Sequence, residues 1–452
     1  MELKNKRVLV VGLGKSGIAA AKFLRTLGAR VTVSDTRSAV ALANEIPALL
    51  DAGIMVEAGG HGLLTFRRQD LIVVSPGVSL DTPEVKQVLG YGMPVIGELE
   101  LASRFLQGSV VAITGSNGKT TTTTLVGKIF ADAGIPTQVG GNIGLPVIEL
   151  IAQSTRETVN VLEVSSFQLE TVVEFHPRIA VILNITPDHL DRHGSFERYV
   201  AAKEKIFERQ TNEDALVLNA DDRTAQMCAA HTKASVYWFS ATRVVRQGAF
   251  VRDGVVCWIA HEGGSAEPIL PVVEIPLKGA HNVENVLAAV AAARLSNISP
   301  ETIRTTVAGF HAVEHRLEFV RSARGVEYYN DSKATNVDAA LKAVQSFPGK
   351  LHLILGGKDK NSDYTQMARL LTERVKAVYT IGSAAEKIQR QLAGVVKIEA
   401  AETLAVAVAR ASSSAVAGDV VLLAPACSSF DQFENYEHRG RVFRQLVQEL
   451  PA

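Results

Sequence analysis

Short apolar runs recur along the whole chain, and segments with helical spacing separate them. Eight runs predict strands, at residues 7–12, 30–35, 70–77, 109–115, 159–165, 179–186, 351–357 and 419–426. Because these runs are continuously apolar and rich in β-branched residues, we expect each strand to be covered on both faces. The pattern therefore predicts an α/β fold with parallel sheets between layers of helices.

The order of these elements divides the chain into three predicted domains. One series ends near residue 97, before the strand predicted at 109–115, and a helical stretch ends near residue 312. We expect domains at 1–97, 98–312 and 313–452. The length of 452 residues agrees with about three domains.

Composition narrows the functional classes. Lys+Arg and Asp+Glu are equal at 47 each, so no basic excess favours a nucleic acid partner. Cys228, Cys257 and Cys427 are far apart and form no CxxC pair, so neither a zinc site nor a disulfide framework is expected. No apolar run approaches the roughly 20 residues of a membrane helix. With a strand directly after "MELKNK", we expect no signal peptide, no membrane partner and a cytoplasmic location.

A first glycine loop follows the first predicted strand. The segment "GLGKSG" at 12–17 is a GxGxxG motif, and Asp35 ends the next strand. This spacing favours a Rossmann-like domain with an anion at the helix N-terminus. Three interpretations stay open: a dinucleotide site, a turn needed only for packing, or a nucleotide diphosphate site in which Thr36 and Arg37 hold a ribose and a phosphate.

A second glycine loop follows the strand predicted at 109–115. The window 113–120, "ITGSNGKT", lacks the first glycine of the usual P-loop pattern but carries Gly115 two places later. Backbone N–H groups of such a loop surround phosphate oxygens. Lys119 can bridge the β- and γ-phosphates of ATP, and the Thr120 hydroxyl can bind Mg²⁺.

Three further side chains could serve a metal near this loop. Glu163 lies inside an apolar strand, where a carboxylate needs a partner, although a frayed strand edge is the alternative. His189 follows another buried strand and is either a metal ligand or a surface residue. Lys203 falls in the middle of an apolar stripe at helical spacing in 196–207. Lys203 either extends its ammonium to water or is buried with a lowered pKa. A neutral amine could then take up CO₂ as a carbamate, an acidic ligand for Mg²⁺.

Nine segments together resemble the Mur ligases, the ATP-dependent amide-forming enzymes of peptidoglycan synthesis. They are "TGSNGKTTT", "EVSSFQLE", "NITPDHLDRHGS", "YVAAKEKIF", "KGAHNVENVLAA", "EHRLEFV", "NDSKATN", "LGGKDKN" and "ACSSFDQFENYEHRG". The resemblance covers all three predicted domains. It implies a Rossmann-like N-terminal domain, a P-loop ATPase-type central domain and a Rossmann-like C-terminal domain. We separately expect the chain to be a monomer.

"NDSKATN" and "ACSSFDQFENYEHRG" are most similar to the members that add D-glutamate to UDP-N-acetylmuramoyl-L-alanine through an acyl phosphate. A Mur ligase with another amino-acid acceptor is the main alternative. A nicotinamide-dependent oxidoreductase would leave the P-loop unexplained. The resemblance also implies that the N-terminal domain holds UDP and not a dinucleotide.

The resemblance assigns roles to particular residues. The UDP-substrate would contact Ser16, Asp35, Thr36, Arg37, Gly77 and Asn142. ATP would contact Gly115, Ser116, Asn117, Gly118, Lys119, Thr120, Thr121, Asn282, Asn285, Arg316 and Asp331. Two Mg²⁺ ions would be held by Thr120, Glu163, His189 and carbamylated Lys203, with Lys119, His189 and Lys203 as the catalytic set.

The implied acceptor site lies in the third domain. D-glutamate would contact Thr335, Lys360, Ser429 and Tyr436. Lys358 stands where some relatives carry an acidic residue, so the choice between Lys358 and Lys360 stays open. Without the resemblance, several of these residues have ordinary structural explanations: Asn282 could cap a helix, and Tyr436 could be a core aromatic.

Overall fold

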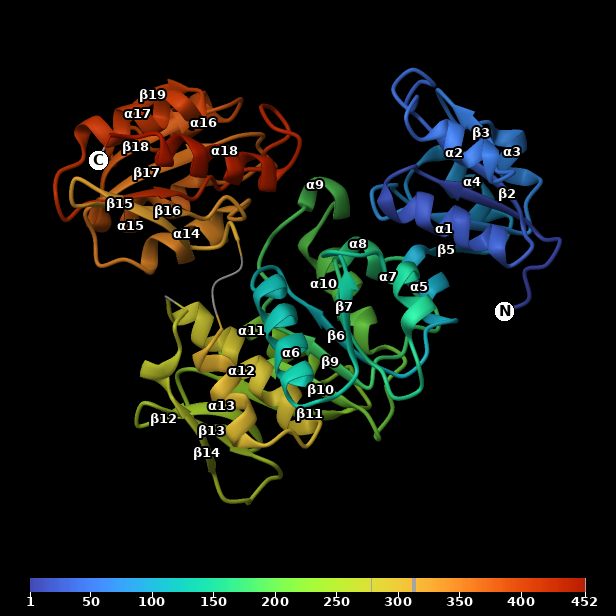
Figure 1. Cartoon of the computed structure of the whole chain (residues 1–452), viewed down its shortest axis with the longest axis horizontal. Coiled ribbons are helices and arrows are strands. Elements are labelled where there is room, and N and C mark those ends of the chain that lie inside the picture. Colours follow the sequence, from blue (N-terminus) through green and yellow to red (C-terminus); the bar gives the residue numbers. More distant parts are fainter. Residues whose placement is uncertain (278, 311–313, 452) are drawn as a thin grey trace. The chain divides into compact units, whose positions relative to one another are not determined.

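The computed structural model describes residues 1–277, 279–310 and 314–451, and Figure 1 shows the helices and strands of the chain. The chain divides into two compact units. The first unit comprises Met1–Ile185, Glu197–Leu270 and Leu287–Thr306, and the second comprises Thr186–Phe196, Pro271–Val286 and Val307–Ala452. No helix in the described part of the chain is long and apolar enough to cross a membrane.

The first unit begins with a five-stranded parallel sheet in the order β3-β2-β1-β4-β5. The strands are β1 (Arg7–Val11), β2 (Arg30–Asp35), β3 (Met55–Ala58), β4 (Leu71–Val74) and β5 (Val95–Gly97). The helices are α1 (Lys15–Thr26), α2 (Ile46–Asp51), α3 (Leu63–Arg67), α4 (Pro83–Gly90) and α5 (Glu98–Ser103). One apolar face of the sheet packs against Phe66 of α3 and Val85 and Val88 of α4, and the first glycine loop joins β1 to α1.

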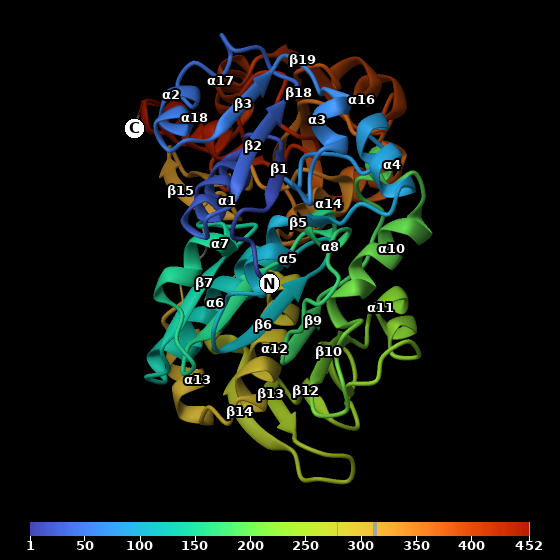
Figure 2. The same ribbon diagram turned by 90° about the vertical axis from the view of Figure 1, so that its right-hand side faces the viewer.

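A nine-stranded sheet completes the first unit, in the order β14-β13-β12-β11-β10-β9-β6-β8-β7. The strands are β6 (Ser109–Thr114), β7 (Thr137–Gly141), β8 (Val159–Glu163), β9 (Ile179–Ile182), β10 (Ala215–Asn219), β11 (Ser235–Ser240), β12 (Gly248–Arg252), β13 (Val255–Ile259) and β14 (Glu267–Pro271). The helices are α6 (Lys119–Asp132), α7 (Val147–Leu150), α8 (Ser166–Leu169), α10 (Phe196–Glu204), α11 (Arg223–Cys228), α12 (Ala280–Leu295) and α13 (Pro300–Ala308). The first turns of α12, up to Val286, and the end of α13, from Val307, belong to the second unit. Helix α6 starts at the P-loop and packs against β6, β7 and β8 (Figure 2).

The second unit contains a six-stranded sheet in the order β15-β16-β20-β17-β18-β19, together with the short helix α9 (Leu190–His193). The strands are β15 (Glu318–Ala323), β16 (Val326–Asn330), β17 (Leu351–Gly356), β18 (Val375–Ile381), β19 (Lys397–Glu402) and β20 (Val420–Leu423). The helices are α14 (Val337–Gln345), α15 (Ala368–Arg374), α16 (Ala385–Gln391), α17 (Leu404–Ser414) and α18 (Tyr436–Gln448). Leu353 and Leu355 pack in one core cluster with residues of α14–α16, whereas Ile354 packs in another with residues of α17 and α18, as strand alternation requires.

The α/β prediction is confirmed, and each of the eight predicted strands contains a strand of the structure. The sheets are mostly parallel, as expected, and two of the described strand pairs are antiparallel. β12 pairs with β13 in antiparallel fashion, and so does β15 with β16. Both pairs are joined by tight turns, at Asp253–Gly254 and at Arg324–Gly325, with positive φ at all four residues. Such turns bring a chain directly back beside itself.

Glu98 is a buried carboxyl group between the two sheets of the first unit. Its side chain begins α5 and is 1% exposed. Oε1 accepts the N–H of Ile148 at 2.7 Å, whereas buried Oε2 has no partner within the described residues. Burial raises the pKa of Glu98 to about 7, and the hydrogen bond from Ile148 offsets only part of that effect.

Glu98 should make the stability of the protein depend on pH. The folded chain holds this proton more tightly than the unfolded chain does. Stability therefore falls as pH rises from the ordinary value of 4.5 to about 7, by about 3 kcal/mol in total. Glu98→Gln cannot ionise, so its melting temperature should decline less than that of the wild type between pH 5 and pH 8. Glu149→Gln removes a nearby exposed carboxylate and should keep most of the wild-type decline. Parallel curves for the wild type and Glu98→Gln would contradict the prediction.

Candidate functional site

The P-loop connects β6 to α6 through glycines that its backbone conformation requires. Gly118 precedes the helix with φ of 87°, and Gly115 has φ of 156°. A Cβ atom on Gly115 would lie 3.0 Å from Cβ of Leu183, so a side chain there would also be crowded. The loop therefore presents backbone N–H groups at a helix N-terminus, the arrangement that binds phosphate.

The predicted phosphate and metal residues of the first unit meet around this loop. Thr120 Oγ1 donates to Glu163 Oε2 at 2.7 Å. Asn142 Nδ2 donates to Glu163 Oε1 at 2.9 Å. Lys119 Nζ contacts the carbonyl oxygens of Gly115 and Ser116 at 2.8 and 2.9 Å, so its ammonium lies over the loop. Hydroxyl and carboxylate oxygens are the donors that Mg²⁺ prefers, and this pair fits such an ion.

Lys203 is buried and does not extend to water. Its side chain is 1% exposed, and Nζ donates to the Gly115 carbonyl at 2.9 Å and to Thr114 Oγ1 at 3.4 Å. The ammonium also lies 4.7 Å from the centre of the Tyr199 ring. Of the two alternatives left open for Lys203, the structure therefore shows the buried one, and the fold brings the amine against the P-loop.

Asn184 and Tyr199 hold the P-loop, and sequence reasoning assigned neither a role at the site. Asn184 Oδ1 accepts the N–H of Asn117 at 2.8 Å, and its Nδ2 donates to the Asn117 carbonyl at 3.1 Å. The hydroxyls of Ser116 and Tyr199 lie 3.0 Å apart. Asn184 is 67 positions from Asn117, so no local sequence motif predicts that these two residues are hydrogen-bonded.

The first glycine loop borders a cavity of about 420 Å³. It is lined by Gly12, Leu13, Gly14, Lys15, Ser16, Asp35, Thr36, His61, Ser75, Pro76, Gly77, Val78 and Asn142. Five of the six residues predicted for the UDP-substrate therefore share one cavity, and the sixth, Arg37, pairs with Asp35 at 2.9 Å. Sequence reasoning missed His61, whose Nδ1 lies 2.8 Å from Ser34 Oγ.

Asp35 fixes the shape of this loop through its carboxylate. Oδ2 accepts the N–H of Leu13 at 2.7 Å, and Oδ1 accepts the N–H of Arg37 at 2.9 Å. Burial raises the pKa of Asp35, but the hydrogen bonds from Arg37 and Leu13 outweigh it and bring the pKa to about 2. The Asp35 carboxylate is thus ionised. Close packing also requires a glycine at position 17 of the same loop, because a Cβ atom there would lie 1.9 Å from the Gly12 carbonyl oxygen.

Asn142 connects the two glycine loops. It lines the cavity beside the first loop, and its amide also holds Glu163 beside the second. A ligand in the cavity that reaches Asn142 therefore also comes close to the carboxylate of Glu163, which accepts a hydrogen bond from Thr120. Asn142 therefore links the lining of this cavity to the carboxylate of Glu163.

The other predicted nucleotide residues belong to the second unit. Asn282 is the third residue of α12 and therefore not its cap, and its Oδ1 accepts from Asn285 Nδ2 at 2.9 Å. Burial raises the pKa of Asp331 to about 6, although the charge of Arg316 opposes that shift. Within the described residues, the buried Nε of Arg316 has no hydrogen-bond partner. A phosphate or hydroxyl of a ligand would supply one.

His189 also belongs to the second unit, whereas Glu163 and Lys203 belong to the first. Its part in a shared metal site therefore stays a prediction. Across the described residues, no three His, Cys, Asp or Glu side chains are grouped so that they could hold a metal ion. The Thr120 and Glu163 pair beside the P-loop is therefore smaller than such a group.

Three of the four predicted acceptor residues, Thr335, Lys360 and Ser429, lie on loops of the second unit, and Tyr436 begins α18. Ser429 is buried, and Thr335 is half-buried just before α14. The Tyr436 ring begins α18 and lies 5.1 Å from Lys333 Nζ. Lys360 is held by an ion pair, whereas Lys358 is exposed.

Arg439, which sequence reasoning missed, joins the two loops of this region. It is fully buried and donates to the carbonyl oxygens of Ser332, Cys427 and Ser428 at 2.8 to 3.3 Å. Burial lowers the pKa of Arg439 to about 10. Five donors in a fixed plane suit it to several carbonyl groups at once.

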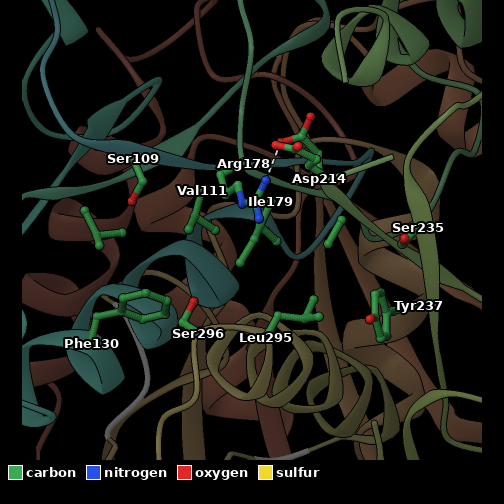
Figure 3. Close-up of a pocket in the computed structure, with 13 residues that line it drawn as sticks. Ser109, Val111, Phe130, Arg178, Ile179, Asp214, Ser235, Tyr237, Leu295 and Ser296 are labelled. Atoms are coloured by element: carbon green, nitrogen blue, oxygen red, sulfur yellow. Dashed lines mark hydrogen bonds and ion pairs between the residues drawn. The ribbon is translucent and has the colours of Figure 1, made fainter. Parts of the chain in front are cut away.

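A further cavity of about 370 Å³ lies at the amino ends of β6, β8, β9, β10 and β11, and none of the predicted site residues lines it (Figure 3). Asp214 at its rim accepts from Arg178 at 3.3 Å and from Thr211, and pairs with His176 at 2.7 Å. The P-loop lies at the opposite, carboxyl edge of this sheet, where parallel sheets bind their ligands.

Comparison with known families matches three descriptions to successive parts of the chain. "Mur ligase MurD-like, N-terminal domain" matches residues 6–97, "Mur ligase middle domain" matches 113–293, and "Mur ligase, glutamate ligase domain" matches 315–427. Two relatives are both called UDP-N-acetylmuramoylalanine–D-glutamate ligase. The one from Acidobacterium capsulatum is 68% identical over 99% of this chain and 97% of its own. The one from Koribacter versatilis is 57% identical over 100% and 99%.

Solved structures show the same fold at low identity. A pseudomurein peptide ligase type C from Methanothermus fervidus is 21% identical with a TM-score of 0.61, covering 99% of this chain and all of its own. The UDP-N-acetylmuramate-alanine ligase MurC from Thermotoga maritima is 19% identical with a TM-score of 0.60, covering 98% and 99%. These similarities concern the fold alone.

Proposed function

Because the chain belongs to the Mur ligase family, we propose that it uses ATP to join D-glutamate to UDP-N-acetylmuramoyl-L-alanine in peptidoglycan synthesis. Relatives of that name share 68% and 57% of its residues over nearly the full length. The structural observation that carries the proposal is the contact of Asn142 with both the glycine-loop cavity and Glu163. That contact suits a substrate whose UDP end lies in the cavity and whose carboxylate end reaches the P-loop.

We assign one substrate to each of the three predicted domains. Residues 1–97 would bind the UDP part, 98–312 would bind ATP and Mg²⁺, and 313–452 would bind D-glutamate. The ionised Asp35 beside Arg37 supports the first role, since it fixes a loop of N–H groups at a helix N-terminus. The unpartnered Nε of Arg316, among the described residues, supports a nucleotide contact from the second unit.

The reaction must activate a carboxylate, because a carboxylate does not react with an amine in water. The L-alanyl carboxylate would attack the γ-phosphate of ATP, forming an acyl phosphate while ADP leaves. The amine of D-glutamate would then attack the acyl carbon, and phosphate would leave as the amide forms. Lys119, now resting on two loop carbonyls, would turn to the phosphate oxygens and stabilise their charge in the transition state.

Thr120 and Glu163 would hold Mg²⁺, which supplies positive charge at the phosphates when bound. We propose two ions, the second held by His189 and a carbamate on Lys203. The buried amine of Lys203 beside Gly115 supports that modification. We further propose that the chain acts as a monomer in the cytoplasm, where ATP is made and used.

Phosphate release from ATP tests the function. The purified chain would be supplied with UDP-N-acetylmuramoyl-L-alanine, Mg²⁺, bicarbonate and a panel of amino acids. Release with D-glutamate alone is the expected result. Release with a different amino acid would keep the mechanism and assign the chain to another acceptor. A folded sample that releases phosphate with no amino acid of the panel would contradict the proposal.

Asp35→Asn should weaken binding of the UDP-substrate selectively. Asparagine keeps one oxygen acceptor but loses the charge that pairs with Arg37 and one of the accepted N–H bonds. Losing a charged, partly buried hydrogen bond costs on the order of 1.5 to 3 kcal/mol, so KM for the UDP-substrate should rise about tenfold or more. KM for ATP should stay unchanged.

Asp81→Asn is the matched control for Asp35→Asn, because Asp81 is an exposed carboxylate of the same domain paired with Lys86. It should leave both KM values at the wild-type level. Equal increases in the two KM values of Asp35→Asn would instead indicate a general disturbance of the fold.

A further inference from the structure

The segment that carries His189 is attached to the sheet that carries the acceptor residues. Thr186–Phe196 belongs to the second unit, although its neighbours on both sides in the chain belong to the first. Thr186 Oγ1 lies 3.4 Å from Asp338 Oδ2 of α14, and Asn336 Nδ2 donates to Asp188 Oδ2 at 2.9 Å. The segment therefore contacts the start of α14 at two points.

Asp188 is the centre of this attachment. Its side chain is 9% exposed, and Oδ1 lies 3.7 Å from Lys360 Nζ, whose own side chain is 17% exposed. The same oxygen accepts the backbone N–H of His189 at 2.9 Å. His189 has φ of 54° and ψ of 33°, a left-handed conformation that costs a non-glycine residue about 1 kcal/mol or more. The bond from its N–H to Asp188 helps to hold that conformation.

The contacts of Asp188 reach two parts of the predicted acceptor site. Lys360 is the cation predicted to contact D-glutamate, and its ion pair with Asp188 fixes the direction of its long side chain. Asn336 follows Thr335, and its Oδ1 caps α14 by accepting the N–H of Ala339 at 2.8 Å. One carboxylate thus restrains the cation, the residue beside Thr335 and the backbone of His189.

We propose that Asp188 is a positioning residue for the acceptor amino acid, which orients Lys360 and the Thr335–Asn336 turn while holding the His189 backbone. This inference rests on the proposed function. Asp188 touches neither reacting group in this account. It acts through Lys360 and Asn336, in the way that outer hydrogen-bond partners fix the ligands of a site.

Asp188→Asn tests the proposal because it keeps the size of the side chain but removes its charge. KM for D-glutamate should rise about tenfold to a hundredfold, the usual effect of losing such an outer partner, while KM for ATP and for the UDP-substrate stays near the wild-type value. Asp188→Glu restores the charge and should recover part of the loss. Asp338→Asn is the matched control, because Asp338 also joins this segment to α14 but pairs with Lys342 instead of Lys360.

Three outcomes would overturn the proposal: an unchanged KM for D-glutamate in Asp188→Asn, an equal rise in Asp338→Asn, or equal rises for all three substrates. Measuring backbone hydrogen exchange distinguishes failure of the Asp188 proposal from failure of the proposed function, because the measurement does not require an active enzyme. Asp188→Asn should speed exchange in residues 186–196 and 357–362, and Asp338→Asn should not affect 357–362. If the wild type proved to use another amino acid, KM for that acceptor would be measured instead.

Discussion

Replacing Lys119 by alanine is expected to lower kcat/KM for ATP by about a thousandfold while the fold stays intact. Charge that develops on phosphate oxygens in a site closed to water is stabilised mainly by fixed positive groups, and removing one such donor typically costs a hundredfold to a thousandfold. Lys119 Nζ is already held 2.8 Å from the Gly115 carbonyl, so the ammonium is at the loop before a ligand arrives. Phosphate release under saturating D-glutamate and UDP-substrate measures the effect.

Two further variants make the Lys119 result specific. Lys119→Arg should not restore activity, because a guanidinium is larger and planar where the loop holds a compact ammonium. Lys128→Ala removes an exposed lysine of the same helix, paired with Asp132, and should match the wild type. A loss of less than tenfold in Lys119→Ala would contradict the assignment of Lys119 to the phosphates.

Features set by a few neighbouring residues could be predicted from the sequence. Gly118 has the positive φ that its motif requires, because that constraint lies in the local backbone. Lys203 is buried because its position in an apolar stripe fixes the face of the helix on which it lies. The Glu163 carboxylate has the partner that burial demanded, namely the hydroxyl of Thr120.

Features that depend on distant pairing could not be predicted in this way. Asn184 closes the P-loop from the end of β9, and Arg439 joins two loops from inside α18. Asp188 forms an ion pair with Lys360, which lies 172 positions later in the chain. An asparagine in a loop or an arginine on a helix gives no local sign of its partner. Only the packing of sheets and loops selects it.

The burial of the Lys203 amine beside the P-loop leads to a specific prediction, that this amine reacts with CO₂ to form a carbamate. The ammonium first loses one proton, and uptake of CO₂ by the neutral amine then forms an N–C bond and releases a second proton, so that an anionic oxygen donor replaces the cation. The carbamate nitrogen keeps one N–H, so the bond to the Gly115 carbonyl, now 2.9 Å, could persist. The product would place a carboxylate-like group beside the P-loop, where the described His, Cys, Asp and Glu residues form no metal cluster of three.

Lys203→Met should therefore lower kcat/KM by about a hundredfold to a thousandfold, an effect comparable to the loss of a charge-stabilising group. Wild-type activity should fall in CO₂-depleted buffer and return with bicarbonate, whereas the residual activity of Lys203→Met should not respond. With ¹³C-labelled bicarbonate, a carbamate resonance should appear in the wild type and be absent in the variant. Lys205→Met, which removes an ammonium bonded to the Glu170 carbonyl, should keep both the resonance and most of the activity. Full wild-type activity without CO₂ and without the resonance would leave Lys203 as an unmodified support of the P-loop, because its amine already holds Gly115 and Thr114.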